Sequence, residues 1–216
     1  MQGFFFNPPL TDNYWGHIFA ELYKEKVYAP LIEGKNLKVC LEIGANVGLV
    51  SYYFSQHFEK VIALEPAEEH FEILSHMIAY NKLTNIIPVK KALFFEEGQF
   101  QFHHNKNKTM HSLHTAVADG SSPPEMVQTI TLPKIFEEYG LDKVDFMKLD
   151  CEGSEVEILS SLSFKEVADK IDSLLIEQHQ WNGRHPNQIK EALKNNGFIV
   201  KQLENDADLI VATKYA

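Results

Sequence analysis

The chain has 216 residues, of which 44% are hydrophobic and 12% aromatic, so it can bury a core and is not a disordered segment. Its formal net charge is -10 at pH 7, with a sequence pI of about 5.4, and no block of lysine or arginine interrupts that balance. This charge argues against nucleic acid as a partner and favours a small-molecule or carbohydrate substrate.

The first segment, residues 1–37, is predicted to be a helical lead-in to one domain that spans 38–216. Trp15, Phe19 and Leu22 recur at helical spacing. The first residues lack the basic region of a signal peptide, and no apolar run has the length of a membrane span. We therefore expect a cytoplasmic protein without a membrane partner.

Predicted strands alternate with predicted helices through most of the domain. Such alternation favours βαβ units on a parallel sheet. The last two strands are joined closely enough for a hairpin, so the sheet is expected to end with an antiparallel strand. Strands are predicted at 38–44, 60–66, 86–94, 143–150, 171–179, 198–204 and 206–214, and helices at 47–58, 67–83, 133–140, 153–162 and 186–197.

A loop insertion near 98–127 interrupts the alternation. It contains a short strand at 99–103, a polar stretch rich in histidine, and a return strand at 127–132. Long polar loops in compact domains are usually functional, so we expect this one to cover a site and to bring Ser112 or His114 to the substrate. No defined zinc spacing joins its histidines, which are His103, His104, His111 and His114.

The sequence "EIGANVG" places Gly44, Asn46 and Gly48 where the first strand turns into a helix. Dinucleotide-binding loops have a glycine where Asn46 stands, because the backbone there approaches a pyrophosphate. A turn of this kind is expected to present N–H groups to a carboxylate. These features favour S-adenosylmethionine over a nicotinamide cofactor. Glu65, at the end of the second strand, can accept hydrogen bonds from both ribose hydroxyls.

The run "VDFMKLDCEGSEVEIL" places one lysine and several carboxylates where a predicted strand becomes a helix. Lys148, Asp150 and Glu152 point to one face if the strand continues through them. Charges packed this closely cost free energy unless they are paired or used. A purely structural ion pair of Lys148 with one of the two carboxylates remains open. Glu155 and Glu157 are interpreted mainly as partners of the helix start.

Taken in order, "EIGANVG", "ALEP", "NIIPVKKALF", "KVDFMKLDCEGSEVEIL" and "IEQHQW" resemble the landmarks of the FkbM family of S-adenosylmethionine-dependent methyltransferases. The resemblance spans about 38–214. It implies the α/β, Rossmann-like class I methyltransferase fold, with a seven-stranded, mostly parallel sheet, an antiparallel last strand and helices on both faces. It also implies methylation of a hydroxyl on a sugar or another small molecule, and it leaves a homo-oligomer open.

Carried over to this sequence, the resemblance implies a cofactor-binding set and a catalytic set. Glu42 stands where the family more often has aspartate. An alcohol acceptor needs a general base, for which Asp150, Glu152 and His179 are the candidates. The implied cofactor-binding residues are Glu42, Gly44, Ala45, Asn46, Gly48, Glu65, Lys91 and Ala92, and the implied catalytic residues are Lys148, Asp150, Glu152 and His179.

Three alternatives stay open at this stage. The acceptor could be an amine, a protein or a nucleic acid instead of a hydroxyl. The sheet could also belong to a nicotinamide-dependent oxidoreductase, or to a binding protein without turnover. No resident metal is predicted, although a divalent ion held by Asp150, Glu152, Glu177 or His179 could polarise a hydroxyl directly.

Overall fold

The computed structural model describes residues 27–106, 111–115, 118–120, 122–179, 186–203 and 206–214. The helices are α2 (Ala29–Ile32), α3 (Leu49–Ser55), α4 (Glu68–Tyr80), α5 (Leu132–Glu138), α6 (Glu155–Ser160), α7 (Leu162–Val167), the 3-10 helix η3 (Ala168–Lys170) and α8 (Pro186–Asn195). The strands are β1 (Leu37–Ile43), β2 (Phe58–Leu64), β3 (Ile86–Val89), β4 (Ala92–Leu93), β5 (Gln99–Phe102), β6 (Glu125–Ile130), β7 (Phe146–Leu149), β8 (Ser173–Glu177), β9 (Ile199–Leu203) and β10 (Asp206–Thr213).

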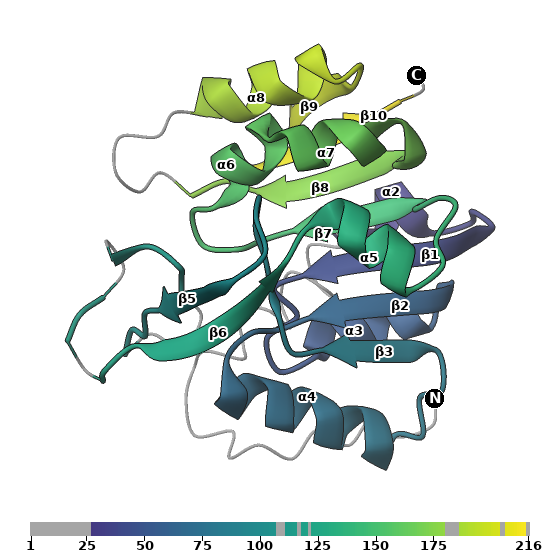
Figure 1. Cartoon of the computed structure of the whole chain (residues 1–216). Coiled ribbons are helices and arrows are strands. Elements are labelled where there is room, and N and C mark those ends of the chain that lie inside the picture. The colour runs from purple at the N-terminus through teal and green to yellow at the C-terminus, as the bar shows by residue number, and fades with distance from the viewer. Residues whose placement is uncertain are drawn as a thin grey trace.

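Seven strands form the central sheet in the order β3, β2, β1, β7, β8, β10, β9 (Figure 1). Strands β3, β2, β1, β7 and β8 pair in parallel, and β10 is antiparallel to both of its neighbours, β8 and β9. The sheet reverses between β1 and β7, so the carboxyl ends of these two strands flank a topological switch point, where α/β proteins bind ligands. The predicted fold class, including the antiparallel last strand, is confirmed.

Helices pack on both faces of the sheet, because strand side chains alternate between the faces. Leu41 and Met147 belong to the core beneath α5, α6, α7 and α8. Cys40 and Phe146, one position earlier on the same strands, belong to the core beneath α2, α3 and α4. The alternation therefore directs Glu42 and Lys148 to the α3 face, and these two residues are register partners on β1 and β7.

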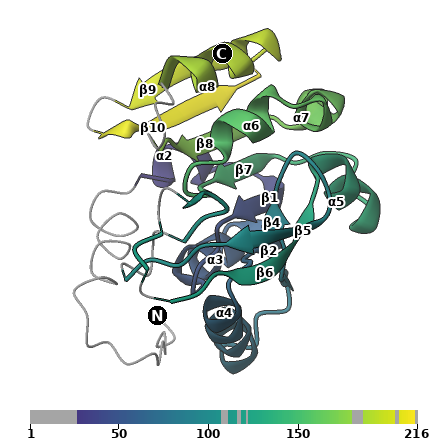
Figure 2. The same cartoon turned by 60° about the vertical axis from the view of Figure 1, so that its left-hand side comes forward.

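The insertion contains regular structure. Strands β5 and β6 pair antiparallel, and β6 also pairs with β4, which gives a second sheet of three strands. In Figures 1 and 2, β5 and β6 reach beyond the sheet on the side of its carboxyl ends. The predicted single strand at 86–94 is thus wrong, because its second half leaves the main sheet as β4 to pair with β6.

The predicted helix at 153–162 is also corrected. Ser161 has extended backbone angles and ends α6, and its hydroxyl accepts the N–H of Phe164 to begin α7, a helix the sequence pattern did not predict. Most of the expected N-terminal helix lies outside the described residues, and α2 is the part that is described. Within the described residues, no helix combines the length and apolar character that crossing a bilayer requires.

Candidate active site

A cavity of about 290 Å³ opens at the carboxyl ends of β1, β2 and β7. It brings together residues that are far apart in the sequence. Most of the predicted cofactor-binding residues lie in its wall, and so do three of the four candidate catalytic residues. These wall residues are Gly44, Ala45, Asn46, Glu65, Lys91, Ala92, Lys148, Asp150 and Glu152.

The glycine loop after β1 is shaped by close packing. Gly44 has φ +76°, and a Cβ added there would overlap the backbone oxygen of Asp150. Gly48 has φ +89°, and a Cβ there would lie 2.5 Å from the side chain of Met77. Asn46 adopts φ 51°, a conformation that asparagine tolerates better than most residues. The glycines are therefore required by the approach of β7 and α4.

The expectation that this loop presents N–H groups to a ligand is wrong for its first residues. The N–H groups of Gly44 and Ala45 donate to the carbonyl of Leu64, at 3.1 and 2.9 Å. The N–H of Asn46 donates to the Glu65 carboxylate, at 2.8 Å. The loop uses these donors because a sharp turn against β2 must satisfy its own buried backbone groups.

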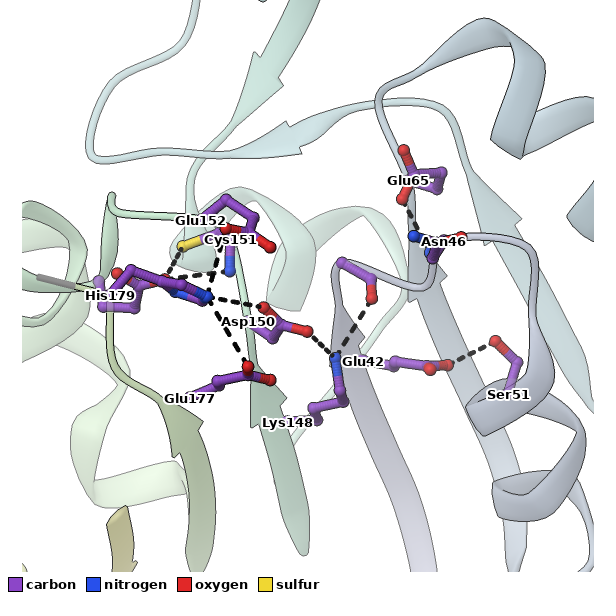
Figure 3. A network of polar contacts seen from close by, with 12 residues as sticks. Glu42, Asn46, Ser51, Glu65, Lys148, Asp150, Cys151, Glu152, Glu177 and His179 are labelled. Atoms are coloured by element: carbon purple, nitrogen blue, oxygen red, sulfur yellow. Dashed lines mark hydrogen bonds and ion pairs between the residues drawn. The ribbon is translucent and has the colours of Figure 1, made fainter. Parts of the chain in front are cut away.

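Glu65 lies at the end of β2 with its carboxylate held toward the cavity (Figure 3). One oxygen accepts the N–H of Asn46, and the other accepts the N–H of Ala67 at 2.9 Å. Burial raises the pKa of Glu65 to about 7, although these two hydrogen bonds act in the opposite direction. The carboxylate is therefore fixed in position and remains able to accept further hydrogen bonds from a ligand.

Two residues expected at the cofactor lie behind the cavity wall. Gly48 packs on Leu74 and Met77 of α4. Glu42 is fully buried and accepts the hydroxyl of Ser51 at 2.6 Å on one oxygen (Figure 3). Among the described residues, no donor reaches its other oxygen, Oε1. Burial raises the pKa of Glu42 to about 7, with Lys148 and Ser51 only partly opposing it.

A Glu42→Gln substitution is expected to change how stability depends on pH. The folded state holds the Glu42 proton up to about pH 7, whereas the unfolded chain releases it near 4.5, so stability falls as pH rises through this window. Between pH 5 and pH 8 the free energy of unfolding in urea should therefore fall less in the variant than in wild type, by up to about 3 kcal/mol. Exposed Glu59→Gln is the control, and parallel pH curves for Glu42→Gln and wild type would contradict the prediction.

Lys148 reaches the cavity from β7 and is almost fully buried. Its Nζ lies 2.7 Å from Oδ2 of Asp150 and donates to the carbonyl of Gly44 at 3.3 Å (Figure 3). Burial alone would lower the pKa of Lys148, but the charges of Asp150 and Glu42 raise it above its ordinary value. The ion pair that the sequence left open is therefore present, and Asp150 is the partner.

The expectation that Glu152 continues the strand is wrong. Strand β7 ends at Leu149, and Glu152 has φ 54° on the turn that leads to α6. This turn still brings the Glu152 carboxylate to the cavity wall beside Asp150. Burial raises the pKa of Glu152 well above its ordinary value, the charge of His179 lowers it in part, and Asp150 adds to the increase.

His179 follows β8 and completes the cluster. Its Nε2 lies 3.3 Å from Oε2 of Glu152, 3.9 Å from Oδ1 of Asp150 and 3.8 Å from Oε1 of Glu177 (Figure 3). One ligand atom each from Asp150, Glu152 and His179 lie within 4.8 Å of one another, a spacing that a divalent cation could bridge.

The insertion contacts the same turn. The Ser112 hydroxyl donates to the carbonyl of Glu152 at 2.6 Å, and Nε2 of His114 lies 3.2 Å from the Ser154 hydroxyl. Ser112 and His114, which were expected to contact the substrate, thus contact the turn after β7. His111 of the same insertion lines the cavity. The His111 ring stacks on His70, with centroids 4.9 Å apart. His70 also lines the cavity, and no sequence pattern predicts this, because it lies at an ordinary position on the amphipathic helix α4.

Comparison with known proteins agrees with this geometry. The sheet order, with its antiparallel strand β10, is that of the class I methyltransferase fold. The profile of the family described as "Methyltransferase FkbM domain" matches residues 42–200. The chain therefore belongs to the FkbM methyltransferase family, which disfavours the nicotinamide-dependent alternative.

Individual relatives are distant. Methyltransferase sdnD of Sordaria araneosa is 25% identical over 214 residues, covering 85% of this chain and 82% of that protein. The crystal structure of methyltransferase FkbM from Methylobacillus flagellatus KT superposes with a TM-score of 0.57 at 14% identity. That match covers 94% of this chain and 56% of the other, so this chain spans little more than half of that structure's length.

A further similar structure contains a ligand. Magnesium protoporphyrin IX methyltransferase (ChlM) from Synechocystis PCC 6803, solved with bound S-adenosylmethionine, has a TM-score of 0.55 at 12% identity. The match covers 97% of this chain and 86% of that one. At this identity the likeness establishes the fold alone.

Proposed function

We propose that this protein transfers a methyl group from S-adenosylmethionine to a hydroxyl of a small molecule or sugar. The observation that carries the proposal is that one cavity connects the glycine loop and Glu65 with the cluster of Lys148, Asp150 and Glu152. A donor site and a base for the acceptor are thereby adjacent, as an alcohol acceptor requires.

The donor half of the cavity is formed by β1, β2 and the segment that links β3 to β4. Glu65 would accept the ribose hydroxyls, because two backbone N–H groups already hold its carboxylate in place. Lys91 and Ala92 form the adjoining wall, where the adenine is expected. When bound, the cofactor would supply an electrophilic methyl group on its sulfonium sulfur. The sulfur would leave as a neutral thioether.

The acceptor half is formed by the ends of β7 and β8. Lys148 pairs with one oxygen of Asp150 and leaves the other, Oδ1, on the side of His179. A carboxylate here would take the acceptor's hydroxyl proton as the oxygen attacks the methyl carbon. Asp150 and Glu152 both line the cavity, and they are the proposed bases for this step.

Replacing Glu65 tests the donor half. Glu65→Ala removes an acceptor for two ribose hydroxyls, so it should weaken S-adenosylhomocysteine binding by about tenfold or more in titration calorimetry. Glu59→Ala, on the same strand but exposed, is the matched control. An unchanged affinity in Glu65→Ala would remove the ribose assignment.

A transfer assay tests the whole proposal. The protein is incubated with methyl-labelled S-adenosylmethionine and a cell extract from the source organism, and labelled products are identified by mass spectrometry. Label in a small molecule as a methyl ether supports the proposal. Label in an amine, in protein or in nucleic acid would contradict the hydroxyl acceptor, and a rise in melting temperature with NADH alone would contradict the donor.

A further inference from the structure

Glu155 makes contacts that exceed those of a helix start. It is the first residue of α6, and its side chain is 1% exposed. Its Oε1 accepts the backbone N–H groups of Cys151 and Gly153, both at 3.1 Å, and lies 3.0 Å from Nδ1 of His179. One buried carboxylate oxygen thus joins the turn after β7 to the residue that follows β8.

This contact determines which way the His179 ring faces. Because Nδ1 is directed to Glu155, Nε2 is directed to the three carboxylates at the cavity, which belong to Asp150, Glu152 and Glu177. Among the residues that the structure describes, these four carboxyl groups lie within 4 Å of the ring nitrogens. The cation Lys148, which also lies at this cluster, is paired with Asp150.

The charge of the cluster favours a protonated ring. Burial lowers the pKa of His179, but the hydrogen bond and charge of Glu155, together with Glu152 and Asp150, raise it well above its ordinary value. A protonated imidazole is no base, but it offsets the repulsion between Asp150 and Glu152. The turn itself also depends on Glu155, since Glu152 and Gly153 adopt φ values of 54° and 111° beside the N–H groups that Glu155 accepts.

We infer that Glu155 is a positioning residue for the transfer reaction. It holds His179 with Nε2 against Asp150 and Glu152, and it holds the turn that presents Glu152 to the cavity. This inference rests on the proposed function for its catalytic consequence, while the orientation of His179 is a property of the protein alone.

The test compares wild type with Glu155→Gln, because glutamine keeps an oxygen for the two backbone N–H groups but removes the charge. NMR of ¹⁵N-histidine-labelled protein should show His179 protonated throughout about pH 6 to 8 in wild type, and titrating within that range in the variant. The kcat should fall by about ten- to a hundredfold, with the KM and the affinity for S-adenosylhomocysteine changed less than about twofold. Glu166→Gln, exposed on α7, is the control.

Several outcomes would overturn the inference. His179 titrating near neutral pH in wild type would do so even if Glu155→Gln failed to fold. An unchanged kcat in a folded Glu155→Gln variant would also overturn the inference. In that case the transfer activity of the wild-type protein would still support the proposed function. Transfer that stops with EDTA, with Mn²⁺ broadening the His179 signals, would make His179 a metal ligand instead. If wild type transferred no methyl group, the proposed function would fail, and the NMR titration would still test the contact between Glu155 and His179.

Discussion

An Asp150→Asn variant is expected to lose methyl transfer by about a thousandfold while it still binds S-adenosylhomocysteine. Asp150 lies at the cavity, with Lys148 2.7 Å from one oxygen and the other oxygen on the side of His179. Asparagine preserves the shape and can still accept from Lys148, but it takes up no proton. The expected signature is therefore a loss in kcat with little change in cofactor affinity.

Two comparisons make this result interpretable. Asp169→Asn is the matched control, because that carboxylate is exposed and pairs with Lys214 away from the cavity. Glu152→Gln tests the other carboxylate at the same turn. If Asp150→Asn retained wild-type turnover and Glu152→Gln lost it, the base would be Glu152. The pH profile of kcat/KM gives a second test. If its acid limb moved in Glu152→Gln and not in Asp150→Asn, the base would again be Glu152.

The framework of the fold could be predicted because it depends on local patterns. Hydrophobic runs that end at Gly44, Glu65 and Asp150 predict parallel strands, and their carboxyl ends necessarily meet at one edge of the sheet. Six of the eight residues assigned to the cofactor by family resemblance do line the cavity there. Alternation also predicts Lys148 and Asp150 on one side of the strand, but the choice of Asp150 over Glu152 as the partner of Lys148 comes from the structure.

What could not be predicted depends on contacts between distant segments. Glu152 reaches the cavity from a turn with positive φ, which alternation along a strand does not describe. Ser112 bonds to the carbonyl of Glu152, forty residues away, so its role as a tether has no local signature. Glu155 has the expected position at a helix start, but its contact with His179 requires β7 and β8 to be neighbours. In each case chain topology, and not residue type, decides what the side chain contacts.

A Gly44→Ala substitution in the glycine loop is expected to lower the free energy of unfolding strongly. Gly44 has a positive φ, and an added Cβ would overlap the backbone oxygen of Asp150. Asp150 has little freedom to move, because its N–H donates to the carbonyl of Ile43. The strained φ and the overlap together should cost about 4 kcal/mol in urea unfolding. Gly44 and Asp150 both line the cavity. The Gly44→Ala substitution should therefore also displace the cavity wall and weaken the binding of S-adenosylhomocysteine.

Gly34→Ala separates the two contributions. Gly34 has nearly the same φ, +73°, but nothing lies within 4 Å of the added Cβ, so this variant should lose only about 1 to 2 kcal/mol and keep its cofactor affinity. The difference between the two variants then measures the overlap with Asp150. Equal losses would mean that the backbone conformation alone requires glycine, and that the loop and the Asp150 turn are packed less tightly than their contact implies. A larger loss at Gly44 would show that the donor and acceptor halves of the cavity are held together at this point.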